Sequence, residues 1–294
     1  MSISSVPVES TAAVNSAQAE VRRREFLREL THQKAFIAGA IILGFWILSA
    51  IFGSLVVQDP LAQNLSAINQ APSGAHLFGT DQLGRDVLAR VIIGARPVLI
   101  VAPLSTLIGT VFGTALGLIM GYYRGLVDDV VGRFVEAFLA LPLVVTGILG
   151  VVALGDSNAT LILVIGIVFT PLIARTVRAA VLVERDLDYV SAARLRGESS
   201  LYIMFAEILP NILAPIVVEF TVRLGYAVFT IITLSFLGFG LQPPAPNWGS
   251  EIYTNISGVV AGYWWEVLFD ALAVASLVVG VNMVANSIET ALDA

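Results

Sequence analysis

The sequence of 294 residues contains no cysteine and only two histidines, His32 and His76. Without cysteine the chain can form neither disulfides nor thiolate metal sites, and it offers no thiol nucleophile. Two histidines are too few for a metal cluster built on imidazole. We therefore expect this chain to hold no metal and no cofactor of its own, while the redox compartment stays open.

Lysine is almost as scarce, since Lys34 is the only one in the chain. It lies in the run Gln-Lys-Ala, with no glycine-rich loop before it. A phosphate-binding P-loop requires Gly-Lys followed by Ser or Thr. The chain therefore lacks a Walker-type ATP site, and we expect it not to be an enzyme. Any energy from ATP has to come from another subunit.

Charged residues make up only 13% of the sequence, whereas 57% of the residues are hydrophobic and the mean hydropathy is +0.86. Soluble domains usually carry about 25% charged residues. Long uncharged runs together with so few charges are typical of an integral membrane protein. The net charge of −6 says little, because the positions of the basic residues matter more.

Six stretches are apolar enough, at roughly 20 residues each, to cross a bilayer as helices. We expect them at residues 35–57, 97–121, 134–154, 159–179, 208–233 and 267–288. The sequence therefore predicts an all-α integral membrane protein whose six transmembrane helices form one domain over residues 35–294. Within this domain we expect an outer loop at 58–96 and a cytoplasmic loop at 180–207.

The N-terminal residues lie outside the predicted spans. Residues 1–19 carry one charge and no clear periodicity, so we expect a disordered cytoplasmic tail. Residues 20–34 mix five basic residues with Phe26, Leu27 and Leu30. This composition predicts a basic interfacial helix on an anionic leaflet, or else a charged flank of the first span.

Basic residues are distributed unevenly among the expected loops. If the N-terminus is cytoplasmic, twelve of the sixteen Lys and Arg residues fall on the cytoplasmic side. Three of the others, Arg85, Arg90 and Arg96, lie in the first outer loop, and Arg223 lies within a span. Because cytoplasmic loops are enriched in Lys and Arg, we expect both termini to be cytoplasmic.

Glycines recur at every fourth position in the second span. They are Gly109, Gly113, Gly117 and Gly121. Residues four apart share one face of a helix, and a face without side chains lets another membrane helix approach closely. We expect helix packing along this face, although glycine is also generally frequent in membrane helices.

A polar segment lies between the fourth and fifth spans, at residues 189–210 (YVSAARLRGESSLYIMFAEILP). We expect two short helices joined at Gly197, because glycine readily adopts the positive φ of such a turn. The paired alanines would let a partner approach the backbone, and the two arginines could pair with acidic groups on it. Such a segment suits a contact with a second protein.

The spacing Ala-Ala-x3-Gly-x11-Leu-Pro in this segment resembles the EAA loop of ABC-importer permeases. In that family the loop forms coupling helices that dock into a groove of the ATPase subunit. Ser191 departs from the pattern because it stands in place of glutamate, and Glu207 departs because an apolar residue is common there. The resemblance implies the following ATPase-coupling residues: Tyr189, Ser191, Ala192, Ala193, Arg194, Arg196, Gly197 and Ser200.

Two further segments resemble the dipeptide, oligopeptide and nickel permeases, in the C-type subunit. The first is 76–86 (HLFGTDQLGRD), which continues to 94–96 (GAR). The second is 234–240 (LSFLGFG), followed by 242–249 (QPPAPNWG). The resemblance covers about residues 70–294.

The resemblance implies a type I ABC-importer permease fold, a multi-pass place in the bacterial inner membrane, and ATP-driven import of dipeptides or oligopeptides. The implied partners are a homologous permease subunit, two ATPases that bind ATP and Mg, an extracytoplasmic substrate-binding protein and membrane lipid, but no nucleic acid. Import of a nickel chelate or of glutathione is an alternative within the family. An ion-coupled secondary transporter, which would need its own coupling site, is an alternative from another class.

The outer loop places acidic and basic residues close together in the sequence. Asp81 and Asp86 flank Arg85, and such charges could fold the loop on itself or bind a partner. From the resemblance we expect Asp81, Arg85, Asp86 and Trp248 to contact the binding protein. The tryptophans of this side, Trp248 among them, also suit the aromatic belt at the outer membrane interface.

Ionisable residues inside a membrane span are candidates for function. Glu219 and Arg223 lie four residues apart on one face of the fifth span, so they can pair with each other. We expect either a structural or gating ion pair or a polar lining of the translocation pathway. Glu136 and Asp270 lie near span ends, where we expect them to reach water or lipid headgroups.

Overall fold

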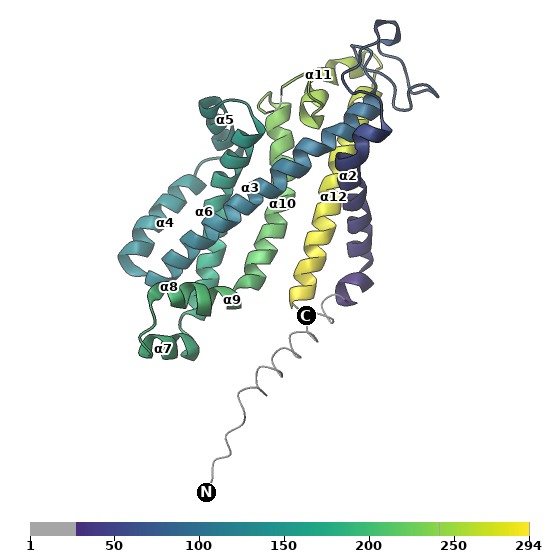
Figure 1. The fold of residues 1–294 in the computed structure, drawn as a ribbon. Coiled ribbons are helices and arrows are strands. Elements are labelled where there is room, and N and C mark those ends of the chain that lie inside the picture. The colour runs from purple at the N-terminus through teal and green to yellow at the C-terminus, as the bar shows by residue number, and fades with distance from the viewer. Residues whose placement is uncertain (1–27, 241, 294) are drawn as a thin grey trace.

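The computed structural model describes residues 28–240 and 242–293, which form a bundle of helices (Figure 1). The tail expected at 1–19 lies outside the described residues, and so do residues 20–27 of the expected interfacial helix. Residues 28–32 of that expected helix are helical. The long helices are α2 (Lys34–Val56), α3 (Val87–Tyr123), α6 (Asn158–Glu184), α10 (Leu213–Phe236) and α12 (Trp265–Asp293). The shorter elements are η1 (Leu65–Ala67), α4 (Gly125–Leu139), α5 (Leu143–Leu154), α7 (Asp188–Leu195), α8 (Ser200–Tyr202), η2 (Ile203–Ile208), α9 (Leu209–Asn211) and α11 (Trp248–Val260).

Five helices are long and apolar enough to cross a membrane, and α4 with α5 makes a sixth crossing if the pair is counted as one span. The pair is bent by 90° at a break after Leu139, so residues 134–154, expected as one span, do not form one continuous helix. Hydropathy is continuous through this region, but Pro142 has no N–H to continue a helix and lies at the break. The chain therefore turns sharply within the third crossing.

Helix α3 begins ten residues earlier than the span expected at 97–121. Its start is fixed by Asp86, whose carboxylate accepts a hydrogen bond from the backbone N–H of Ala89. The last residues of the expected outer loop 58–96 are therefore helical. With 37 residues α3 is about 55 Å long at 1.5 Å per residue, and it runs obliquely across the bundle (Figure 1).

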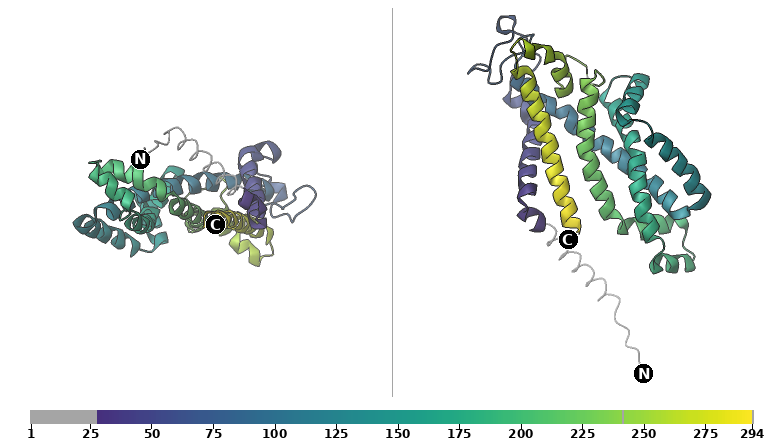
Figure 2. Two further views of the ribbon diagram at one scale, coloured as in Figure 1. Left: turned by 90° about the horizontal axis from the view of Figure 1, so that it is seen from below. Right: turned by 180° about the vertical axis from the view of Figure 1, so that it is seen from behind.

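The elements are sorted between the two ends of the bundle. Figures 1 and 2 show the start of α2, the C-terminal end of α12 and the helices α7 to α9 toward one end, which we call the α7 end. Helix α11 and the loop between α2 and α3 lie at the opposite end, which we call the α11 end. Both ends of the membrane domain therefore lie on the same side as α7.

The glycines that recur along α3 lie directly against α6. They are Gly109, Gly113, Gly117 and Gly121, and the residues that they face on α6 follow the same spacing: Phe169, Ile173, Val177 and Val181. A Cβ atom built on any of these glycines would lie 2.6–2.9 Å from the Cβ atom of the facing residue. Real Cβ atoms do not approach that closely, so this packing requires glycine at all four positions.

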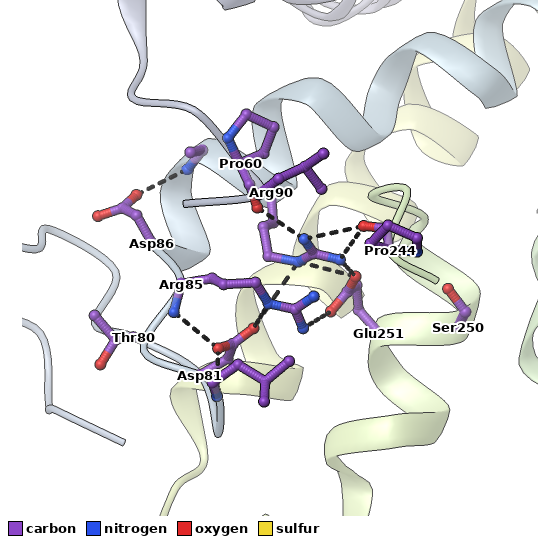
Figure 3. Close-up of polar contacts among 12 residues, drawn as sticks. Pro60, Thr80, Asp81, Arg85, Asp86, Arg90, Pro244, Ser250 and Glu251 are labelled. Atoms are coloured by element: carbon purple, nitrogen blue, oxygen red, sulfur yellow. Dashed lines mark hydrogen bonds and ion pairs between the residues drawn. The ribbon is translucent and has the colours of Figure 1, made fainter. Parts of the chain in front are cut away.

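At the α11 end, a buried network of charges holds the outer loop to the bundle (Figure 3). The Arg85 Nε donates to Asp81 at 2.6 Å, and both side chains are almost completely buried. Arg90, at 2% exposure, pairs with Glu251 of α11 and donates to the carbonyl of Pro60 at 2.8 Å. The network therefore joins the loop, α3 and α11, which are far apart in the sequence.

The expected contacts of the outer loop with a binding protein need correction, because their side chains point inward. Asp81, Arg85 and Trp248 are 1%, 5% and 0% exposed. Asp86 caps α3 and accepts a bond from His76, whose Nδ1 lies 2.9 Å from its carboxylate. The indole of Trp248 donates to the carbonyl of Val91 at 2.8 Å, so this tryptophan belongs to the core and not to an interfacial belt.

Two other residues were expected to reach water or headgroups. Glu136 is exposed on α4, and its contact with water or headgroups stays a prediction. Asp270 does not reach water or headgroups, because its side chain is only 2% exposed within the first turns of α12. The position of a residue near the end of a span therefore did not decide its exposure here, since α11 covers the start of α12.

The close contact between α3 and α6 predicts that even a methyl group in place of a glycine hydrogen lowers the stability of the protein. Gly117→Ala places a Cβ atom 2.6 Å from that of Val177, and overpacking of this kind typically costs about 1–3 kcal/mol. We expect a lower midpoint of thermal unfolding for the purified protein in detergent. The control is Gly44→Ala in α2, where no atom lies within 4 Å of the new Cβ; an equal loss of stability in both variants would contradict the packing argument.

The buried network at the α11 end predicts a non-additive response. Glu251→Gln removes the closest ionic partner of the buried Arg90 guanidinium and leaves only Asp81 at 4.0 Å; breaking a buried ion pair typically costs about 3–5 kcal/mol. Replacing both residues, Arg90→Met with Glu251→Leu, removes the uncompensated charge, so we expect this double variant to be more stable than Glu251→Gln. Thermal unfolding followed by tryptophan fluorescence measures both, and the prediction fails if the double variant is the least stable.

Candidate functional site

The polar segment after α6 folds into four short elements, α7, α8, η2 and α9. Helix α7 ends at Leu195, and Gly197 follows with a φ of +78°, which turns the chain toward α8. The hydroxyl of Ser199 caps α8 by accepting a bond from the N–H of Tyr202. The segment thus contains the turn at Gly197, and its second half includes a stretch of wider, π-type helix at Ile203–Ile208.

Apolar residues anchor this segment to the bundle. Val190 and Ala193 of α7 are completely buried, as are Ile203 and Ile208 in η2. Residues 190 and 193 are three apart and therefore lie on one face of α7. Of the two alanines expected at a partner contact, Ala193 belongs to this inner face, whereas Ala192 is exposed.

Arginines fasten the same segment to the end of α3. Arg185 donates to the backbone carbonyls of Gly121 and Tyr122, at 3.2 and 2.5 Å, which are left without partners at the end of a helix. Its burial lowers the pKa of the Arg185 guanidinium, and the nearby Arg124 and Arg194 add to this. The guanidinium of Arg194 lies 5.3 Å from the ring centre of Tyr122, a cation–π contact.

Tyr189 links the segment to both neighbouring helices. Its hydroxyl donates to Glu184 at 2.8 Å and accepts from the amide of Asn211 at 3.2 Å. Burial and the Glu184 hydrogen bond raise the pKa of the Tyr189 phenol to about 12, although the Asn211 bond acts in the other direction. The phenol therefore stays neutral at physiological pH and can bridge α6 and α9.

The outward face of the segment combines small and apolar residues. Ser191, Ala192 and Gly197 are exposed, and Ser200 is partly exposed. Leu195 is 90% exposed between two arginines, and the sequence analysis did not single it out. Other exposed apolar side chains of the segment are Leu201, Tyr202 and Phe205. The sequence did offer a signal for these exposed residues, because they are apolar side chains within a polar segment.

Arg196 already has acidic partners within the chain. Its guanidinium donates to Glu207 at 2.9 Å and lies 3.8 Å from Glu198. Glu207 is one of the two departures from the EAA pattern, and here it pairs the two halves of the segment across the turn. Because the arginine side chain is 53% exposed, this pair contributes little stability, and Arg196 remains accessible.

Glu219 and Arg223 of α10 form the expected ion pair, with Nε donating to the carboxylate at 2.6 Å. The hydroxyl of Thr176 in α6 donates to the other carboxylate oxygen at 3.3 Å. Both charged side chains are largely buried, at 12% and 19% exposure. The pair therefore joins α10 to α6, and a role in lining a pathway stays a prediction.

Among the described residues, no group of three or more His, Asp or Glu side chains could hold a metal ion.

Comparisons with known proteins show the family of this chain. Residues 113–294 match the family described as binding-protein-dependent transport system inner membrane component, and residues 22–72 match the N-terminal TM domain of oligopeptide transport permease C. The dipeptide transport system permease protein DppC of Escherichia coli is 37% identical over 277 residues, covering 92% of each chain. DppC of Alkalihalophilus pseudofirmus is 37% identical over 271 residues, covering 92% of this chain and 89% of that protein.

A solved structure has the same fold. The MetNI methionine ABC transporter, in an inward-facing conformation, matches with a TM-score of 0.56 over 70% of this chain and 96% of the matched chain. At 20% sequence identity this likeness concerns the fold alone. The family match covers more than half of the chain and the relatives cover nearly all of it. The chain therefore belongs to the family of binding-protein-dependent transport system inner membrane components.

Proposed function

We propose that this chain is the permease subunit of an ATP-driven importer of dipeptides or oligopeptides and that it forms half of the translocation pathway. The observation that carries the proposal is the segment 188–211. Arg194 contacts Tyr122 at the end of α3, Tyr189 bonds to Glu184 of α6, and the inner side chains are buried, yet the segment presents a small and apolar outer face. A partner that binds this face and then moves would displace the helices that contact the segment.

The α7 end is the cytoplasmic side in this proposal, and both termini lie there. The count of Lys and Arg residues supports it, because cytoplasmic loops are enriched in them. The ATPases bind ATP and Mg, and the chain itself holds no cofactor. When ATP binding draws the ATPases together, α7 moves with them, α3 and α6 follow, and the bundle opens to the outer side. ATP hydrolysis in the partners resets it.

The other partners follow from the family and from the relatives. A family of binding-protein-dependent transport components implies an extracytoplasmic binding protein, a second permease subunit and two ATPases. The names of the relatives favour dipeptides or oligopeptides over a nickel chelate or glutathione. A dependence on a binding protein also argues against the secondary transporter.

Leu195 offers a sharp test of the docking face. Leu195→Asp puts a charge on a side chain that is 90% exposed, so folding should be unaffected. We expect the purified permease complex to retain fewer ATPase subunits and to lose most of the ATP hydrolysis that loaded binding protein stimulates. Val260→Asp is the matched control, because Val260 is 95% exposed at the α11 end. Unchanged ATPase retention and stimulation in Leu195→Asp would refute the docking role.

A substitution at Gly197 tests the role of the turn that orients this face. At a φ of +78° a β-branched residue is strained, although no neighbouring atom lies within 4 Å. We therefore expect Gly197→Val to shift α7 and to weaken coupling between ATP hydrolysis and transport. Gly155 has a φ of +88°, equally open surroundings and a place at the far end of α5, so Gly155→Val is the matched control. Equal coupling in the two variants would contradict a special role for this turn.

A further inference from the structure

A polar cavity of about 360 Å³ opens near the α7 end of the bundle. It lies between the end of α3, one face of α4 and the second half of α6. Charged residues dominate its lining: Asp128, Asp129, Arg133 and Glu136 from α4, and Arg175 and Arg178 from α6. Its volume lies at the lower end of the range of small-molecule sites, about 300–1,000 Å³.

Two of these six charges satisfy each other. Arg178 donates to both carboxylate oxygens of Asp128, each at 2.5 Å, which is the bidentate geometry of a strong pair. No ion pair joins Asp129, Arg133, Glu136 or Arg175 to another side chain within the described part of the chain. The cavity therefore offers two carboxylates and two guanidiniums that are free to bind a ligand.

The four unpaired charges come from two helices that border the cavity. Arg175 lies nine residues before the end of α6, about 13 Å along the helix axis, and Glu136 lies in the fourth turn of α4. The side chains of Asp129, Arg133, Glu136 and Arg175 are all exposed, so they line the open side of the cavity. Charges of both signs therefore border a space that water can enter.

We propose that this cavity binds a small zwitterion, with the free carboxylate of the ligand at Arg133 and Arg175 and its ammonium group at Asp129 and Glu136. The equal number of free acidic and basic groups favours a ligand that carries both charges over a simple anion such as a lipid phosphate. A short peptide with free ends has this chemistry. The choice of peptide as ligand rests on the proposed function, and the site would hold imported peptide near the cytoplasmic exit.

The test measures direct binding of radiolabelled dialanine to the complete transporter in nanodiscs without binding protein. We expect dialanine to bind, and N-acetyl-dialanine and dialanine amide to bind about tenfold more weakly, because each has lost one charged contact. Arg175→Gln should reduce the preference for dialanine over its amide, since only Arg133 then remains for the carboxylate. Glu136→Gln should reduce the preference over the acetylated form, since only Asp129 then remains for the ammonium group.

Arg96→Gln is the matched control, since it removes an exposed arginine of α3 near the α11 end, outside the cavity, and should leave all three affinities unchanged. Absence of dialanine binding to the wild-type complex, or equal affinity for the three ligands, would overturn the proposal. So would dialanine binding that disappears when phosphatidylglycerol replaces phosphatidylcholine in the nanodisc, because the cavity would then be a lipid site. Peptide transport that continues with binding protein would leave the proposed function standing in each case.

Discussion

The backbone contact between α3 and α6 is the constraint on which the rest of this structure depends. Four glycines remove the side chains from one surface, so α6 can lie against the main chain of α3. This proximity continues past the last glycine. Because Gly121 faces Val181, Arg185 one turn later reaches the terminal carbonyls of α3 and satisfies them. The anchor of the coupling segment is therefore a consequence of helix packing.

Helix α3 also connects the two ends of the molecule. Near its first residues Arg90 lies in the buried network with Glu251, and at its last residues Tyr122 lies under Arg194. One continuous helix thus carries an ionic anchor at the α11 end and a cation–π contact at the α7 end. A displacement of α7 can reach the outer loop through this helix without any intermediate loop, which is the property that a permease needs to couple its two faces.

Local patterns in the sequence predicted the features that depend on local spacing. The glycine repeat predicted a packing face, and Gly197 predicted the turn after α7. The failures depend on residues far apart in the sequence or on geometry that hydropathy does not record. Glu251 stands 161 residues from Arg90, so the inward role of the outer charges could not be read from residues 76–96. The helix expected at residues 134–154 followed the apolar average of this stretch, which concealed the 90° bend at Pro142.

Arginine has two different roles in this fold, and the role depends on whether its ion pair with a carboxylate is buried or exposed to water. At the α11 end Arg85 and Arg90 are 5% and 2% exposed and paired inside the structure. A buried ion pair of this kind is costly to open, so it fixes one arrangement. At the α7 end Arg196 pairs with Glu207 in water, at 53% exposure, and can exchange that partner at little cost. The molecule is therefore locked at the α11 end and adaptable at the α7 end, where the ATPases of the proposed importer would act.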